Sequence, residues 1–369
     1  MKKIFFSIVA LAALAACSKS EVAYEQTQEI GFKAVAGNMT KTAVSGDAYP
    51  EELNMYVNAW TTDFTGTDAN YISNGLFVCK DNFEDYTEKD DPTNVNPIVW
   101  GGETPYYWPN TKELYFAGYS ASGNVANLYA EDEDNVDNDD YVNNITYDCV
   151  AGKLSIKGYV PGTTANNDLM FFPKTSEAYG KSTDYVRVNM IHTCAWITFL
   201  VKGDGVTGTS TSSYAVESLT ITGIYDTGDL TCTGSDVEWD FTNEDNTPKY
   251  TNNATFTVLP DVEGDNTSIA GTNESAVKAE NPEDNTVLIP QLPGMLTLVY
   301  SYTSPAGQVI TETRSDLDLT LDGTAAKATE WEAGKHYIYT ITIKANEILI
   351  APTPVDWADP TVDTGVTVQ

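Results

Sequence analysis

The stretch "YIYTITIKANEILI", residues 337–350, decides the fold class of this chain. From Tyr337 to Ile343, tyrosine and isoleucine occupy every second position, which places them on one face of a strand. β-branched and aromatic residues dominate the stretch, as a pleated surface prefers. The pattern predicts one long strand near the end of the chain. Pro352 and Pro354 follow, and because proline cannot donate to a ladder, we expect this end at a sheet edge.

Similar strand patterns recur along the chain from about residue 29, separated by clusters of Gly, Asn, Asp, Pro and Ser with almost no helical period. The regular spacing predicts an all-β protein built from sandwiches. The further candidate strands are Glu29–Val35, Leu53–Trp60, Ile98–Trp100, Glu113–Tyr119, Lys153–Gly158, Tyr185–Met190, Ala195–Val201, Val216–Ile224, Asn253–Leu259, Asn285–Ile289, Met295–Tyr302 and Val309–Asp316.

The length of 369 residues suffices for two domains, because single cores stop growing near about 250 residues. We expect the boundary near Lys181–Asp184, where "GKSTD" precedes the strand series "YVRVNMIHTCAWITFLVKG". His192 lies inside that series. A lone histidine in such a strand is expected to be a hydrogen-bonded core residue rather than a catalyst.

The chain is strongly acidic, with 53 Asp and Glu against 20 Lys and Arg and a formal net charge of −33. Nucleic acid and anionic membrane surfaces should therefore repel it. The sequence contains no nucleophile elbow, HExxH, P-loop or strand-following GxGxxG motif, so we expect neither enzymatic activity nor a cofactor.

The N-terminus carries the most specific local signal. Lys2 and Lys3 precede the short apolar run Ile4–Ala16, which is typical of a signal peptide and too short to span a membrane. The run ends in "LAAC" at Cys17, which resembles the lipobox of bacterial lipoproteins. We expect residues 1–16 to be removed and Cys17 to carry palmitate-like acyl chains that anchor the protein. The alternative is an ordinary secretory signal with an incidental cysteine.

The later cysteines are widely and irregularly spaced. They allow two disulfides in three connectivities, and we treat them as buried small hydrophobic residues. Only His192 and His336 could join them in binding zinc and no CxxC pair exists, so no metal site is expected. These cysteines are Cys79, Cys149, Cys194 and Cys232.

Together with the lipobox, several segments resemble the fimbrillin family, the lipoprotein precursors of type V pili. The closing pattern W-x-x-G-x-x-Y-x-Y-x-I-x-I is the most telling, and it spans Trp331 to Ile343 here. The resemblance covers essentially the whole chain. The other segments are "EIGFKA", "TKTA", "PIVWGGETPYYWP", "LYFAGYSA", "DLMFF" and "VNMIHTCAWITFLV".

The resemblance implies two tandem transthyretin-like Greek-key β-sandwich domains. It also divides the chain into five parts. These are the signal peptide 1–16, a propeptide 17–41 with a removable first strand, an N-terminal domain 42–183, a C-terminal domain 184–346 and a tail 347–369.

The resemblance further implies a precursor anchored in the outer membrane, exposed at the surface and then assembled into a fimbrium for cell adhesion. A protease removes the first strand, with Ile30, Phe32 and Ala34 facing inward, and the groove takes a strand from another subunit of the same or a related kind. Family members matured by an arginine-specific protease carry Arg at the cut. The first arginine here is Arg187, so Lys41 is our candidate site and Lys33 the next.

The donated strand is expected in the tail, and a host or bacterial surface molecule is the expected ligand of the pilus. The candidate donor residues are Ile348, Ile350, Val355, Trp357, Val366 and Val368. The alternative reading is a monomeric, surface-anchored glycan-binding lipoprotein that uses exposed aromatics such as Tyr106, Tyr107 and Trp108. Their alternation with turn residues favours a corner of the core instead.

Overall fold

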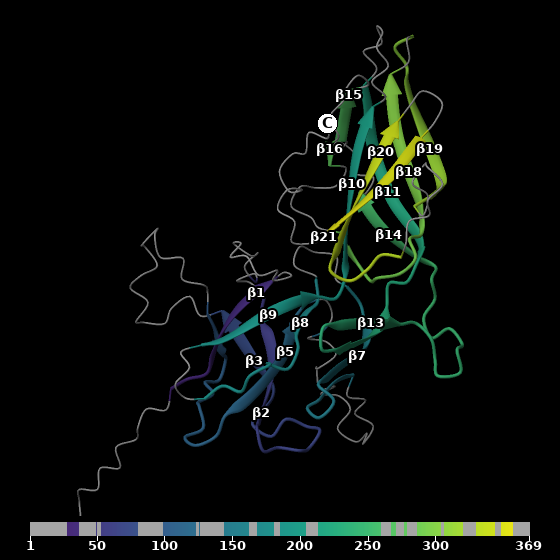
Figure 1. Ribbon diagram of the computed structural model, residues 1–369. Helices are drawn as coiled ribbons and strands as arrows, with labels where there is room; N and C mark the ends of the chain where they lie inside the picture. The colour runs from purple at the N-terminus through teal and green to yellow at the C-terminus, as the bar shows by residue number, and fades with distance from the viewer. Residues whose placement is uncertain are drawn as a thin grey trace, which may run out of the picture.

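The elements described in the computed structural model are all β-strands (Figure 1), which confirms the predicted all-β class. The residues described are 28–36, 49, 53–79, 99–122, 125, 144–161, 168–180, 185–203, 213–259, 267–270, 277–278, 286–303, 306–319, 330–343 and 348–356.

A closed barrel forms the first part of the molecule, in the order β1-β4-β3-β2-β5-β8-β9. Neighbouring strands are antiparallel except for β1 and β9, which are parallel. In β9, Val186, Val188 and Met190 are buried while Arg187 is exposed, as the period of two predicts. The strands are β1 Gly31–Ala36, β2 Met55–Thr61, β3 Ile72–Cys79, β4 Trp100–Gly102, β5 Leu114–Ser120, β8 Met170–Phe172 and β9 Val186–His192.

A second sheet has the order β13-β12-β7-β6 and joins distant parts of the chain. The β12–β13 hairpin follows the boundary expected near residue 183, yet it pairs with β7 from before that boundary, for example Thr231 with Ser155. Gly234, at φ 60°, lies in the hairpin's tight turn. The strands are β6 Ile145–Asp148, β7 Lys153–Tyr159, β12 Gly228–Thr233 and β13 Asp236–Asp240.

Two further sheets share one core. The first has the order β16-β10-β20-β21 with β17 also on β10, and the second has the order β14-β11-β18-β19 with β15 also on β11. Phe199 and Tyr339 of the first sheet and Leu298 of the second belong to this core. Figure 1 shows these strands at one end of the molecule and the barrel strands at the other. The strands are β10 Ala195–Gly203, β11 Ser213–Ile224, β14 Ala254–Leu259, β15 Thr267–Ala270, β16 Val277–Lys278, β17 Thr286–Leu288, β18 Met295–Thr303, β19 Val309–Asp318, β20 Lys335–Ile343 and β21 Ile348–Asp356.

The expectation of one long strand over residues 337–350 is wrong. The stretch belongs to two antiparallel strands, β20 and β21, paired from Lys335 with Asp356 to Ile343 with Ile348. The physical reason is that Lys344-Ala345-Asn346-Glu347 interrupt the apolar alternation. As expected from its prolines, β21 lies at the end of its sheet.

The chain passes from the barrel to the shared-core sheets between β9 and β10. Here the indole of Trp239 donates to the carbonyl of Thr193 at 2.8 Å, and the amide of Gly334 donates to the carbonyl of Cys194 at 2.9 Å. The β12–β13 hairpin and the turn before β20 are therefore both hydrogen-bonded to the connection between β9 and β10.

Candidate functional site

β1 closes the barrel between β9 and β4. It pairs in parallel with β9 from Phe32 with Val186 to Ala36 with Met190. With β4 it makes a short antiparallel ladder at Gly31 and Phe32. The first described strand is thus held mainly by one neighbour, and its removal would separate β4 from β9.

The three residues predicted to face inward from this strand are buried. Ile30 and Phe32 are fully buried, and Ala34 is 3% exposed. The Phe32 ring packs edge-on against Phe77 and Phe116, with ring centroids 5.0 and 5.3 Å away. A fully buried Ile or Phe contributes about 1.5–3 kcal/mol. Loss of β1 would therefore open an apolar, aromatic-lined groove.

The two candidate cleavage residues differ in what the structure describes. Lys33 lies within β1, pairs with Arg187 on β9, and places its Nζ 4.7 Å from the centre of the Tyr185 ring. A protease would have to pull this strand out of its ladder to cut there. Lys41 lies outside the described residues, as does the candidate acylation residue Cys17.

Only the first part of the predicted donor segment lies within the described residues. Ile348, Ile350 and Val355 belong to β21, which pairs with β20 of the same chain, and Ile350 is 9% exposed at the shared core. The remaining candidates lie outside the described residues, and they are Trp357, Val366 and Val368. The first part of the tail is therefore folded back on its own subunit.

The outer edge of β21 lacks two hydrogen-bond donors. Alternate residues of an antiparallel strand direct their amides to the partner. The ladder with β20 runs through Pro352 and Pro354 without a register shift, so these prolines occupy positions whose amide would point away from β20. An edge that lacks donors disfavours the addition of another strand. The tail can act as a donor only if β21 leaves β20, or through the residues after Asp356.

The aromatic run around Trp108 lies mostly at a corner of the core, as the sequence favours, and it does not form the exposed sugar-binding surface of the alternative reading. Trp108 is 1% exposed and packs edge-on against Phe116, so the exposed Trp108 of the alternative reading is wrong. Tyr106 stacks on Phe77 of the barrel core, and Tyr107 alone of the three is largely exposed, at 47%. The alternation of this run with turn residues places two of its rings against the core.

Several polar and sulfur-bearing side chains of the described residues are buried or partly buried. His192 pairs through Nδ1 with the Asp168 carboxylate, as expected for a hydrogen-bonded core histidine, and burial raises the pKa of Asp168. Cys149, Cys194 and Cys232 are buried free thiols as expected, and burial raises the pKa of Cys149 to about 12. Cys79 is only partly buried, so the expectation of a buried residue is wrong there. Within the described ranges, no cluster of three His, Cys, Asp or Glu side chains could hold a metal ion. No described helix is long and apolar enough to cross a membrane.

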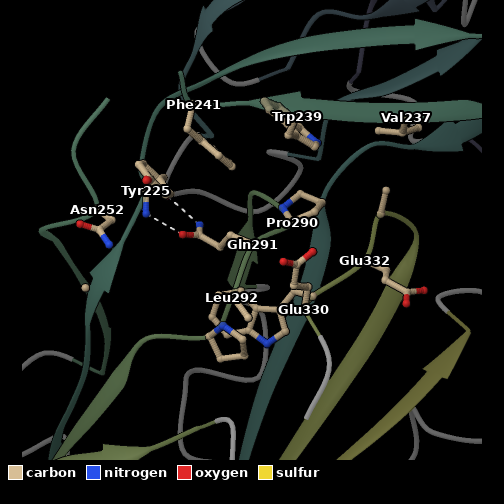
Figure 2. A pocket seen from close by; sticks show the side chains of 14 residues that line it. Tyr225, Val237, Trp239, Phe241, Asn252, Pro290, Gln291, Leu292, Glu330 and Glu332 are labelled. Atoms are coloured by element: carbon tan, nitrogen blue, oxygen red, sulfur yellow. Dashed lines mark hydrogen bonds between the residues drawn. The ribbon is translucent and has the colours of Figure 1, made fainter. Parts of the chain in front are cut away.

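A cavity that the sequence analysis missed lies between the β12–β13 hairpin and two turns next to the shared core (Figure 2). Trp239 and Phe241 line it from the hairpin side, and Pro290 and Glu330 line it from the two turns. Its lining comes from segments about 100 residues apart, so only the fold brings them together. The local sequence signal for this cavity is the pair of aromatic residues at alternate positions in "VEWDF". The same spacing is found in an ordinary β-hairpin, so it does not indicate a cavity.

The family comparisons match most of the chain. The model of the fimbrillin-like family matches residues 40–357, and the model of the prokaryotic membrane lipoprotein lipid attachment site matches residues 1–18. No curated protein shows significant similarity to the sequence.

Solved structures that resemble this chain come from Bacteroides and Parabacteroides species. A fimbrial protein from Bacteroides vulgatus ATCC 8482 is 15% identical over 89% of this chain and 99% of its own, with a TM-score of 0.53. A candidate cell adhesion protein from Parabacteroides distasonis ATCC 8503 is 10% identical over 90% and 97%, with a TM-score of 0.47. One from Bacteroides uniformis ATCC 8492 is 16% identical over 89% and 99%, with a TM-score of 0.44. At 15% identity, the similarity to the Bacteroides vulgatus protein supports the fold alone.

Proposed function

This chain belongs to the fimbrillin-like family, and we propose that it is a structural subunit of a type V pilus assembled by strand exchange. Its precursor is acylated at Cys17 and anchored at the outer membrane, facing outward, before assembly. The lipid attachment match at residues 1–18 supports this step. The role is structural and adhesive, without an active site.

The position of β1 is the observation that carries the proposal. β1 closes the barrel with Ile30, Phe32 and Ala34 buried, yet it pairs with β4 over only two residues. A cut at Lys41 would separate the strand from the rest of the chain, with Lys33 as the second candidate site. The groove left between β4 and β9 would be apolar, and exposed apolar surface of this kind favours binding of a replacement strand.

The replacement strand comes from the tail of a neighbouring subunit. Its candidate residues are Ile348, Ile350, Val355, Trp357, Val366 and Val368. Because β21 is paired with β20 in the same chain, donation requires β21 to exchange its partner or the residues after Asp356 to extend into the neighbour. Each subunit then accepts at one place and donates at another. Such a head-to-tail contact does not close on itself and produces a filament.

In this proposal, the two domains of the subunit are 42–183 and 184–346, and the signal peptide and propeptide precede them. Two strands cross these bounds, because β1 from the propeptide and β9 from the start of the second range both complete the barrel of the first domain. The β12–β13 hairpin of the second domain completes a sheet of the first through β7. The hairpin therefore fixes the two domains to each other, as a load-carrying fibre requires.

Proteolysis followed by electron microscopy tests the proposal. The purified protein is treated with a lysine-specific protease until the N-terminus is Thr42, and the product is compared with an untreated sample. We expect filaments only after treatment. A fully processed protein that stays monomeric at high concentration would contradict strand exchange.

A further inference from the structure

The cavity between the β12–β13 hairpin and the shared-core sheets has the size of a small-molecule site. Its volume is about 730 Å³, within the range of about 300–1,000 Å³ that such sites have. It lies where the sheet of β7 meets the turns before β18 and β20, and binding pockets favour such junctions between structural units.

Hydrogen bonds hold the walls of the cavity in place. Gln291 is 7% exposed, its Oε1 accepts from the amide of Tyr225 at 2.6 Å, and its Nε2 donates to the Tyr225 carbonyl at 2.9 Å (Figure 2). The amide of Trp331 donates to the Gln291 carbonyl at 2.8 Å. Trp239 is fixed by its bond to Thr193. The cavity is therefore preformed, and the side chain of Gln291 shapes it.

The lining combines flat aromatic surface with hydrogen-bond acceptors. Tyr225, which precedes β12, and Phe241, which follows β13, stack with ring centroids 4.1 Å apart and planes 10° apart. Trp239 of β13 lines the same cavity. Glu330 and Glu332 are exposed and contribute carboxylates from the turn before β20. No Lys, Arg or His is among the described residues that line the cavity.

These features select the chemistry of a ligand. Ionised carboxylates only accept hydrogen bonds, so they suit hydroxyl donors and repel anions. Because Tyr225 and Phe241 face each other, they do not surround a point as the rings of a cation-binding cage do. Pyranose rings present both an apolar C–H face that packs on aromatic rings and a rim of hydroxyls. We propose that this cavity is a binding site for a neutral oligosaccharide.

Glycan binding by the purified full chain tests this proposal. The protein is applied to an array of neutral oligosaccharides, and the best binder is titrated by calorimetry. Two variants remove the site in different ways: Glu330→Gln with Glu332→Gln removes the carboxylates, and Ala333→Trp fills the cavity. The matched control is Glu238→Gln, because Glu238 lies on β13 but is exposed and outside the lining.

We expect at least one neutral oligosaccharide to bind, at least tenfold more weakly in both cavity variants and unchanged in Glu238→Gln. Circular dichroism confirms that each variant is folded. Absence of binding across the array would overturn the proposal, as would binding that the cavity variants leave intact. A trilysine peptide is titrated in parallel, and if it binds with the same dependence on Glu330 and Glu332 while no sugar binds, the site is for cations instead. None of these residues lies in β1 or β21, so the result is independent of strand exchange.

Discussion

Phe32 on β1 lies edge-on against Phe116 on β5, with ring centroids 5.3 Å apart and ring planes at 85°. Phe116 also contacts Trp108 and Tyr179, so the ring of the first strand is built into the aromatic core of the barrel. β1 is therefore a structural part of the folded chain. In the strand-exchange proposal, loss of β1 would expose apolar surface that another strand can cover.

Truncation of Phe32 should destabilise the precursor. Phe32→Ala removes a fully buried ring, and such a change costs about 3–5 kcal/mol. Urea unfolding of the unprocessed protein measures the loss. The control is Lys33→Ala on the other face of β1, which should cost much less because the Lys33 side chain is only partly buried and does not belong to the apolar core. Equal losses in the two variants would mean that β1 is not part of the core.

Exchange of Lys41 should block maturation. In Lys41→Ala the protease has no site between β1 and β2, so we expect an unprocessed, lipid-anchored monomer. Gel mobility and N-terminal sequencing show whether the protein is processed. Electron microscopy of cells shows whether it forms polymer. Lys33→Ala is the matched variant and should be processed normally. Normal polymer from Lys41→Ala would refute the assignment of this residue.

Two deletions should separate the roles of the tail. Removal of residues 348–369 should abolish filaments, and it should also lower the melting temperature because the β20–β21 ladder and the burial of Ile350 are lost. Removal of residues 357–369 should leave the melting temperature nearly unchanged, because β21 is kept. Calorimetry measures the melting temperature of each deletion variant. Electron microscopy after protease treatment shows whether the variant forms filaments. Filaments that persist after the longer deletion would rule out the tail as donor.

The Asp229 carboxylate should contribute stability that depends on pH. Partial burial raises the pKa of Asp229, but hydrogen bonds from Lys249, Tyr250 and the amide of Gly158 lower it by more. The net result is a pKa below the ordinary 3.8. The folded state thus favours the ionised form. The contribution is present above the unfolded-state pKa and is lost as the pH falls through the folded-state value.

Melting curves of Asp229→Asn test this dependence. The variant should melt below the parent protein at pH 6, and the difference should shrink as the pH falls below about 3.8. The surface control is Asp226→Asn, whose side chain is exposed and accepts a bond from Thr227. A difference between Asp229→Asn and the parent that stays constant from pH 6 to pH 2.5 would exclude the proposed role of the charge.

The sequence predicts the strands whose burial alternates cleanly. The ranges expected for β10 and β18 agree with the structure to within two residues, because their apolar residues keep the period of two. β3 was missed because Asn74, at φ 49°, and Gly75 interrupt the pattern opposite an irregularity in β2. The β12–β13 hairpin was missed because Gly, Asp and Thr between its apolar residues also fit a loop.

Pairing between distant strands could not be predicted from local pattern. β1 and β9 are separated by about 150 residues, and an alternating strand gives no sign of its partner. The inward positions of Ile30, Phe32 and Ala34 follow from alternation alone, but the neighbours that hold them come from the fold. The same holds for the cavity. Trp239 and Glu330 line it together only because the hairpin packs back toward the shared-core sheets.

The mass of the subunits within assembled filaments tests strand exchange most directly. Filaments sheared from cells are dissolved, and the subunits are measured by intact-mass and peptide mass spectrometry. We predict subunits that begin at Thr42, with every peptide from Gln28 to Ala36 absent. Filaments whose subunits retain residues 28–36 would contradict the account, because the groove between β4 and β9 would still be filled by the chain's own first strand.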